Sequence, residues 1–476
     1  MKLYNTLTRT KETFTTLEPH KVKMYTCGLT VYSHPQIGNW VAYIYSDVLH
    51  RTLLASGYQV DRIQNITDVG HLVSDDDAGE DKMEKGARAE GLTAWDVADK
   101  YIEVADNQAY TQLKLLRPTK MVRATSLIDE QIQFVKDLEK KGYTYIIDDG
   151  VYFDTSKLDD YGKLAQLDIG GLEAGARVDI GGKKSLTDFA LWKLSGKSKK
   201  RDMEWESPWG MGFPGWHLEC SVIARENLGD QIDLHTGGID HIPVHHTNEI
   251  AQTEALTGKK PFSRFWFHNN FIKIDGAKLG KSLNNSYLLE DIVKQGFRIE
   301  AFKLLVLSSH YRTEGNFTWD ILESAQHRLN NWQAIADMRW QVGSEAARIK
   351  EVDMAWDAIL SPLKDDLNTP IAVNNAEDSL NQFLKGYPDW GKQDMDKLLG
   401  FIDQLLGINL AQPDISNELK QLIKDRESAR ETKNWTKSDE LRDQLKSQGL
   451  EVKDTDKGPI WSRLKSTLPV VYMHNV

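Results

Sequence analysis

The stretch that most constrains the fold lies near the start of the chain, between residues 21 and 67. It reads as a strand at 21–27, a loop at 28–39, a helix at 40–57 that ends on glycine, and a second strand at 58–67. A strand, a long loop, a helix and another strand in this order form the repeating unit of doubly wound parallel sheets. The sequence therefore predicts an α/β fold with a Rossmann-like nucleotide-binding sheet.

The same α/β pattern returns after residue 210, which indicates an inserted domain between its two halves. The intervening part holds a helix at 126–142, a hairpin at 143–155 and the glycine-rich stretch "DIGGLEAGARVDIGGKKS". The second half then reads as a helix at 216–229, a strand at 230–235, a loop at 236–243 and a helix from 245.

Strand patterns vanish from about residue 315, where apolar residues recur at helical spacing and predict a helical bundle. Beyond Pro413 come two more helices and a hairpin-like stretch at 450–464. We expect five segments: the first half of the catalytic domain at 1–119, the inserted domain at 120–210, the second half at 211–314, the helical bundle at 315–410 and a small C-terminal module at 411–476.

Charge and composition restrict the class of protein. The net charge of -11 argues against indiscriminate nucleic-acid binding, but residues 411–476 carry 12 basic and 11 acidic side chains, so a local surface there can still bind a polyanion. No stretch approaches the roughly 18 apolar residues of a membrane helix, and no leader pattern opens the chain. Only two cysteines occur, which excludes a disulfide framework. We expect a cytoplasmic protein without membrane contact.

The stretch "HHTNE", residues 245–249, places His245 and Glu249 four positions apart, and thus on one face of a helix. Such a pair is either a solvated helix face or half of a metal site. Cys27 ends the first strand and Cys220 lies on the helix after the insertion. Ligand sites of open α/β sheets lie at the carboxyl ends of the strands, so all four residues could converge there. Two thiolates, an imidazole and a carboxylate would suit zinc.

The chain resembles the cysteinyl-tRNA synthetases, a class I aminoacyl-tRNA synthetase family, over nearly its whole length. The resemblance rests on an ordered series of motifs: "YTCGLTVY", "IGN", "NITDVGH", "DYGKLAQL", "DFALWK", "PGWHLECS", "HTGGIDHIPVHHTNEIAQTEA", "KLGKS", "DDLNTP" and "GPIWSRL". It implies ATP-dependent activation of L-cysteine and its transfer to the 3′ end of tRNA(Cys). It also implies that Cys27, Cys220, His245 and Glu249 hold one Zn²⁺, and that Thr67, Trp216, His217 and His235 line the cysteine pocket.

A zinc ion has a physical reason in such an enzyme. Serine is a near-isostere of cysteine, and burial alone separates near-isosteres only about 10- to 200-fold. A thiol ionises near neutral pH and bonds the metal, whereas an alcohol stays protonated and binds weakly. Zinc is therefore the expected specificity element. For Trp216, packing in the core is the alternative interpretation.

The resemblance also implies an ATP site, with Mg²⁺ bound to the ATP. "QIGN" stands where the family has two histidines around Ile-Gly, so Gln36 and Asn39 can donate hydrogen bonds to phosphate but cannot become cationic. The "KLGKS" loop would supply cations to the leaving pyrophosphate. The complete set expected at ATP is Gln36, Gly38, Asn39, Gly237, Gly238, Asp240, Lys278, Lys281 and Ser282, of which Gln36, Asn39, Lys278 and Lys281 are the expected catalytic residues.

In the C-terminal module, Trp461 is available for stacking on an anticodon base and Arg463 lies beside it. This module argues against one alternative, a ligase that joins cysteine to an amino sugar. A second alternative is a non-catalytic paralogue that binds zinc or RNA, which only the amides of "QIGN" support. A small nucleotidyltransferase explains neither the length nor the zinc ligands. We expect a monomer.

Overall fold

The structure is a computed structural model, and it describes residues 1–69, 82–167, 182–195, 201–277, 286–342, 349–386, 390–455 and 458–464. Its contacts divide the chain into two compact units. The first comprises Met1–Ile272 with Tyr311–Gly315, and the second comprises Lys273–His310 with Asn316–Val476. Each unit is described by itself.

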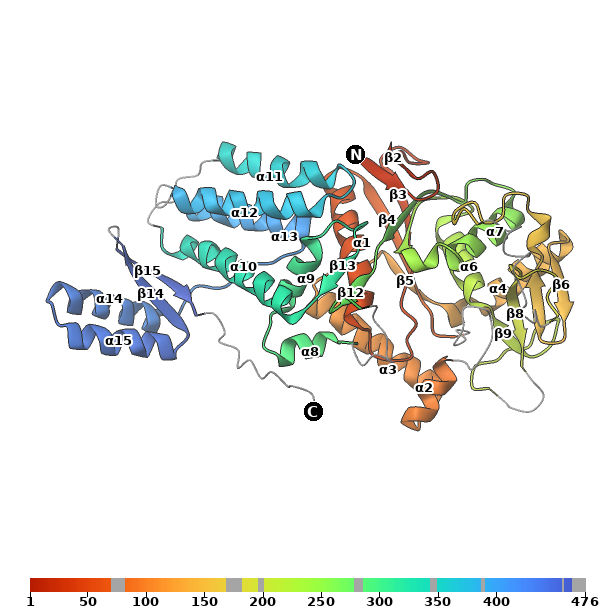
Figure 1. The fold of residues 1–476 in the computed structure, drawn as a ribbon, viewed down its shortest axis with the longest axis horizontal. Coiled ribbons are helices and arrows are strands. Elements are labelled where there is room, and N and C mark those ends of the chain that lie inside the picture. Colours follow the sequence, from red (N-terminus) through yellow and green to blue (C-terminus); the bar gives the residue numbers. More distant parts are fainter. Residues whose placement is uncertain are drawn as a thin grey trace. The chain divides into compact units, whose positions relative to one another are not determined.

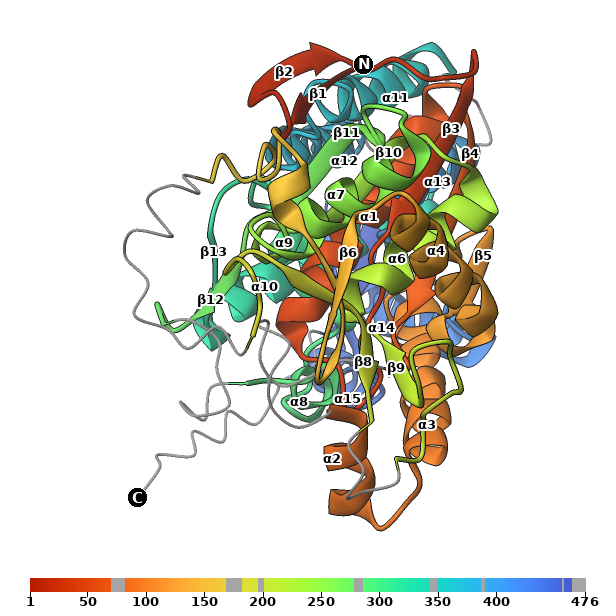
Figure 2. The same cartoon turned by 90° about the vertical axis from the view of Figure 1, so that its right-hand side faces the viewer.

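The first unit contains a five-stranded sheet in the order β11-β10-β3-β4-β5, and all four pairings are parallel. The strands are β3 (Lys21–Thr26), β4 (Gln59–Ile66) and β5 (Lys120–Arg123), which Figure 1 labels, and β10 (Ile232–Gly238) and β11 (Ser263–Asn269), which Figure 2 labels. The two central neighbours, β3 and β10, come from opposite sides of the insertion. The predicted parallel α/β sheet is confirmed.

The strand β10 is longer than the sequence indicated. Residues 236–243 were expected to form a loop, but β10 continues to Gly238, with Gly237 opposite His268 and Gly238 opposite Asn269 on β11. The prediction was wrong because glycine is a poor strand former on its own, whereas pairing with β11 supplies the backbone partners. As a result the two glycines lie at the carboxyl edge of the sheet.

Three helices connect the strands around the site. They are α1 (Ile37–Ala55), between β3 and β4, α6 (Trp216–Leu228), which precedes β10, and α7 (His245–Thr257), which follows it. Each of these helices was predicted within three residues of its observed start. Other elements of this unit are β1 (Lys2–Asn5), β2 (Thr10–Thr13), α2 (Lys82–Glu90), α3 (Ala94–Asp106) and a π-helical turn at Asn107–Gln112.

The expected insertion at 120–210 supplies three strands of a separate antiparallel sheet in the order β6-β7-β8-β9, and β9 lies just beyond its expected end; the sheet is seen beside α4 and α6 in Figure 2. The elements of this region are α4 (Ile128–Lys140), β6 (Thr144–Ile147), β7 (Gly150–Phe153), β8 (Phe189–Leu194) and β9 (Gly212–Pro214). The predicted helix and hairpin correspond to α4 and to β6 with β7. Most of the glycine-rich stretch lies outside the described residues.

The second unit is mainly helical. Its helices are α8 (Leu289–Lys294), α9 (Ile299–Leu307), α10 (Trp319–Asp337), α11 (Ile349–Leu363), α12 (Thr369–Lys385), α13 (Lys392–Leu406), α14 (Asn417–Glu431) and α15 (Trp435–Ser447). Helices were predicted from about residue 315, but the unit also contains α8 and α9, which lie before that residue. A short ribbon of β12 (Ile272–Ile274) and β13 (Gly315–Phe317) is a strand element that the helical pattern did not indicate.

The chain ends in a small module with its own core. The helices α14 and α15 pack on a hairpin of β14 (Leu450–Thr455) and β15 (Gly458–Arg463). The core comprises Ile415, Ile423, Leu445, Leu450, Val452 and Trp461. Among the described residues of the whole chain, no helix is long and apolar enough to cross a membrane.

Candidate metal centre and nucleotide-binding edge

Four donor residues meet at the carboxyl edge of the parallel sheet. Cys27 directly follows β3, Cys220 lies on α6, and His245 and Glu249 occupy the first two turns of α7. One ligand atom from each lies within 4.8 Å of those of the other three. Donors 2.0–2.3 Å from a tetrahedral zinc stand about 3.3–3.8 Å apart, so small movements would let these four hold one ion.

The helix that carries two of these donors is enclosed by protein. Every residue from His245 to Leu256 on α7 is buried. A helix that is buried on all sides cannot present a solvated face, so that interpretation of "HHTNE" is wrong. Polar side chains in such a place need partners, because an unpaired buried polar group is costly.

The carboxylate of Glu249 organises the centre. Its Oε2 lies 2.9 Å from His235 Nε2, and its Oε1 lies 3.0 Å from His245 Nε2. Glu249 is fully buried, and among the described residues Oε1 accepts no hydrogen bond of proper geometry. A buried carboxylate oxygen without a hydrogen bond, next to an imidazole and two thiols, fits a metal ligand.

A second donor set overlaps the first. Cys27, His235, His246 and Glu249 also have ligand atoms within 4.8 Å of one another. Cys27 Sγ lies 3.3 Å from His246 Nε2, and His246 Nδ1 shares a 2.7 Å hydrogen bond with His268 Nε2. Both ring nitrogens of His246 thus have protein partners. The same holds for those of His245, which lie 3.1 Å from His217 Nδ1 and 3.0 Å from Glu249 Oε1. What distinguishes the first set is its two thiolates, which zinc prefers.

The protonation of the donor residues depends on their mutual electrostatic interactions. Burial disfavours charge on Glu249, but the charges of His235 and His245 outweigh it and lower its pKa to about 2. Burial also opposes protonation of His245, yet the negative charges of Cys220 and Glu249 raise its pKa to about 10.

The two thiols behave oppositely. Burial and the hydrogen bond to Cys220 raise the pKa of Cys27 well above its usual value. Burial alone would do the same to Cys220, but the hydrogen bond from Cys27 and the neighbouring His245 lower its pKa to about 6. At neutral pH one thiolate and one carboxylate therefore face a protonated imidazole.

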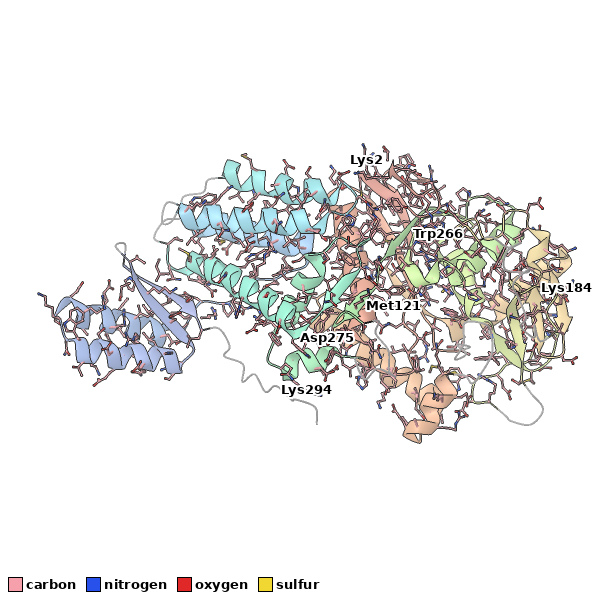
Figure 3. The ribbon with its side chains drawn as sticks, viewed as in Figure 1. Lys2, Met121, Lys184, Trp266, Asp275 and Lys294 are labelled. Carbon is pink, nitrogen blue, oxygen red and sulfur yellow. The ribbon has the colours of Figure 1, made fainter. Side chains whose placement is uncertain are left out.

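The structure brings the four expected pocket residues to this edge. Trp216 is half-buried and stacks on His245, with ring centroids 4.4 Å apart. His217 Nδ1 lies 3.1 Å from His245 Nδ1, and Thr67 accepts a 3.0 Å hydrogen bond from Asn65. His235 stacks on Trp266 of β11, which Figure 3 labels, again at 4.4 Å. Trp216 therefore packs on an expected metal ligand and keeps one side exposed.

At the start of α1, Gln36 and Asn39 are tied into the helix cap. The Asn39 side-chain oxygen accepts a 2.9 Å hydrogen bond from the Gln36 backbone N–H. The amide nitrogen of Asn39 stays available for donation. Gly38 lies between them in the first turn, and this helix N-terminus favours anions.

The other residues expected at ATP lie at the end of β10 or outside the described residues. Gly237 has a packing reason of its own, because a Cβ there would come 2.6 Å from His246 Cε1. Gly238 and the exposed Asp240 follow it. Lys278, Lys281 and Ser282 lie outside the described residues.

The C-terminal module places its aromatic residues differently from expectation. Trp461 is only 5% exposed and belongs to the module's core, so its ring is not presented to a base. Arg463 binds Asp337 at 3.0 Å. Trp435, at the start of α15, is 55% exposed, and the guanidinium of Arg430 lies 5.6 Å from its ring centroid. Burial, which the sequence does not reveal, distinguishes the two tryptophans.

Sequence reasoning missed several neighbours of the centre. His246 is adjacent to His245 in the motif, but spacing alone gave it no role. His268 reaches it from β11 and in turn contacts Thr6 Oγ1 at 2.8 Å. A histidine inside a strand carries no local signal of such a contact. The sequence also gave no reason for glycine at position 28. The structure supplies it, because a Cβ on Gly28 would lie 1.7 Å from the carbonyl oxygen of Asn65.

Comparison with known proteins places the chain among translation enzymes. Residues 13–327 match the family model described as tRNA synthetases class I (C) catalytic domain, and residues 412–461 match that of the Cysteinyl-tRNA ligase anticodon binding domain. The chain is 43% identical to Cysteine–tRNA ligase 1 of Burkholderia lata, over 96% of both chains. It is 37% identical to the Cysteine–tRNA ligase of Treponema denticola, over 98% of this chain and 100% of that one.

Solved structures give the same fold at low identity. The methionyl-tRNA synthetase of Mycobacterium tuberculosis in complex with methionyl-adenylate is 13% identical, with a TM-score of 0.57 over 81% of this chain and 92% of that chain. A LeuRS complex of Agrobacterium radiobacter with tRNA and LeuAMS is 11% identical, with a TM-score of 0.58 over 83% and 85% of the two chains. At these identities the likeness concerns the fold alone.

Proposed function

The chain belongs to the cysteine–tRNA ligase family of the class I tRNA synthetases, and from this premise we propose which of its residues join cysteine to tRNA(Cys). The observation that carries the proposal is the convergence of Cys27, Cys220, His245 and Glu249 at the carboxyl edge of the sheet. These four would hold one zinc ion. The chemistry that a bound zinc would supply is affinity for a thiolate over the hydroxyl of serine.

The chain's own residues position the substrates. Trp216 stacks on His245, His235 holds the Glu249 carboxylate, and Thr67 directly follows β4 at the same edge of the sheet. Gln36, Asn39 and the N-terminus of α1 would bind the phosphates of ATP together with Lys278 and Lys281, and Mg²⁺ would accompany the ATP. The cysteine carboxylate then attacks the α-phosphate and pyrophosphate leaves, which gives the cysteinyl adenylate. A hydroxyl of the terminal ribose of the tRNA next attacks the carbonyl carbon of this adenylate, so that the cysteinyl group is transferred to the tRNA and AMP leaves. Preorganised contacts of this kind account for much of such catalysis.

The experiment that tests this function is pyrophosphate exchange with a panel of amino acids, followed by charging of tRNA(Cys). Exchange with cysteine but not serine, together with charging, is the expected result. Exchange without any charging of tRNA would favour the ligase that acts on an amino sugar. No exchange with any amino acid would favour the non-catalytic paralogue.

Zinc binding should release protons. Metal ligands must be deprotonated, and in the metal-free chain His245, with a pKa of about 10, and Cys27, with its raised pKa, both hold a proton at pH 7.5. Cys220 and Glu249, at about 6 and about 2, contribute almost none. We therefore expect about two protons released per zinc, and an affinity that rises about 100-fold per pH unit below both pKa values.

Calorimetry of zinc added to chelator-treated protein, in two buffers of different ionisation enthalpy, counts these protons. Raising the pH removes the competing protons, so binding should strengthen. An affinity that is constant between pH 6 and 8 would contradict the assignment of Cys27 and His245 as ligands.

For tRNA, we propose that the exposed Trp435 replaces Trp461 as the base-stacking residue. Stacking of a base on an aromatic ring contributes about 1–3 kcal/mol, so Trp435→Ala should raise the KM for tRNA(Cys) by about 5- to 150-fold. Pyrophosphate exchange should not change. A matched control is Trp95→Ala on α3, where the indole is 39% exposed. Equal effects of the two substitutions on the KM for tRNA(Cys) would show that Trp435 does not contact the tRNA.

A further inference from the structure

Trp461 and Arg463 take part in a contact that neither the motif nor the proposed base stacking explains. On one side stand residues 337–341, the end of α10 and the 3-10 turn Met338–Trp340 that follows it. On the other stand Gln412, Pro413, Trp461 and Arg463, which belong to the linker and to β15. We call this contact the joint. Both sides belong to the second unit.

Two kinds of interaction hold the joint together, and the first is a reciprocal pair of hydrogen bonds. The Trp461 backbone N–H donates to Gln341 Oε1 at 2.8 Å, and Gln341 Nε2 donates to the Trp461 carbonyl at 3.0 Å. The side chain of Gln341 thus continues the edge of β15 as another strand would. This arrangement fixes both the distance and the direction of β15.

The second is an ion pair between a buried carboxylate, Asp337, and a partly exposed guanidinium, Arg463. Arg463 Nε donates to Asp337 Oδ2 at 3.0 Å, and another guanidinium nitrogen donates to the carbonyl of Pro413. The Asp337 side chain is only 1% exposed, and Gln333 donates to its other oxygen at 3.2 Å. Desolvation of the buried Asp337 carboxylate offsets part of its attraction to Arg463, so the pair contributes to the joint mainly through its directed hydrogen bonds.

The linker is held as well. Arg339 and the indole of Trp340 both donate to the Gln412 carbonyl, at 2.6 and 3.2 Å, and the Trp340 ring packs against the module's core. A linker between independent domains is ordinarily exposed, with few contacts across it. Here hydrogen bonds join the end of the bundle helix α10 and the turn after it to both the linker and β15.

We propose that the joint is a positioning device, which fixes the orientation of the C-terminal module on the helical bundle so that anticodon binding is coupled to charging. Asp337 and Gln341 are then positioning residues that touch no substrate. The proposal rests on the proposed tRNA function. If the joint were loose, the module would still bind the anticodon arm, but the acceptor end of the same tRNA would seldom reach the catalytic site. The gain in affinity from two linked contacts depends on a geometry that allows both at once.

The test uses the full chain with the double substitution Asp337→Asn and Gln341→Ala. Three RNAs are compared: tRNA(Cys), a minihelix of its acceptor arm, and a hairpin of its anticodon arm. We expect charging of tRNA(Cys), measured as kcat/KM, to fall by about 10-fold or more. Charging of the minihelix and the affinity for the anticodon hairpin should stay within about twofold of the unaltered chain, since each involves only one contact.

Two further variants accompany the double substitution. Arg463→Lys keeps a cation beside Asp337 but loses the second donor to the Pro413 carbonyl, so charging should fall less than in the double variant. Lys397→Met removes an exposed ion pair with Asp353 elsewhere in the bundle and should change nothing. Unchanged charging of tRNA(Cys) in the double variant would overturn the proposal. So would loss of hairpin binding, because the joint would then merely hold the module folded or contact RNA itself.

Failure of the underlying function has a different signature. It would be seen in the unaltered chain, which would then fail to bind the anticodon hairpin or would charge the minihelix as efficiently as tRNA(Cys).

Discussion

Cys220→Ala and His245→Ala should each remove zinc from the purified protein, while His246→Ala should keep one zinc per chain. Cys220 and His245 supply donors that only the first set contains, whereas His246 belongs to the second set and is held by Cys27 and His268. Substituting a residue that orients a ligand typically weakens metal binding about 10- to 100-fold without abolishing it. Elemental analysis after dialysis measures the content.

Activity provides the second measurement. Without zinc, the pocket can distinguish cysteine from serine only by size and packing, which limits discrimination to about 10- to 200-fold. Pyrophosphate exchange with both amino acids should therefore show lower rates with cysteine and a collapsed ratio in Cys220→Ala. Zinc loss in His235→Ala and His246→Ala, but not in Cys220→Ala or His245→Ala, would place the metal in the second set instead.

Lys281→Ala should lower the turnover of adenylate formation by about 10²- to 10³-fold, which is the typical cost of removing one preorganised electrostatic contact. The amides Gln36 and Asn39 cannot become cationic, and the Asn39 oxygen is engaged in the cap of α1. The lysines of "KLGKS" are therefore expected to supply the positive charge that interacts with the phosphates of ATP. Because negative charge builds on the leaving pyrophosphate, the effect should fall on kcat more than on cysteine binding.

Steady-state exchange kinetics over ranges of ATP and cysteine separate these effects. Lys294→Ala is a suitable control, since that lysine is exposed on α8 and pairs with Asp291 at 3.8 Å (Figure 3). An increase in the KM for ATP with unchanged kcat would make Lys281 a ground-state binder. The loop would then have no part in stabilising the transition state.

Individual helices and strands could be predicted from the sequence because the residue patterns that indicate them are short. The alternation of Val22 and Met24 with lysines in β3, and the glycine at position 57 just after α1, depend on neighbours within a few positions. The sheet edge where Cys27 and α7 meet followed from topology, since parallel strands place their carboxyl ends together. The motif series also identified the family without any coordinates.

Tertiary structure decided what depends on residues far apart in the chain. The strand β10 continues past its expected end at His235 to Gly238 because it pairs with β11, and glycine's own conformational preference does not decide this. Cys27 and His246 touch across 219 positions, and no periodicity within either segment encodes that contact. The two tryptophans of the module have equal intrinsic chemistry, yet packing buries Trp461 and exposes Trp435. Sequence thus determined which groups are present, whereas the packing of distant segments determined which of them meet, because burial and side-chain contact are properties of the whole chain.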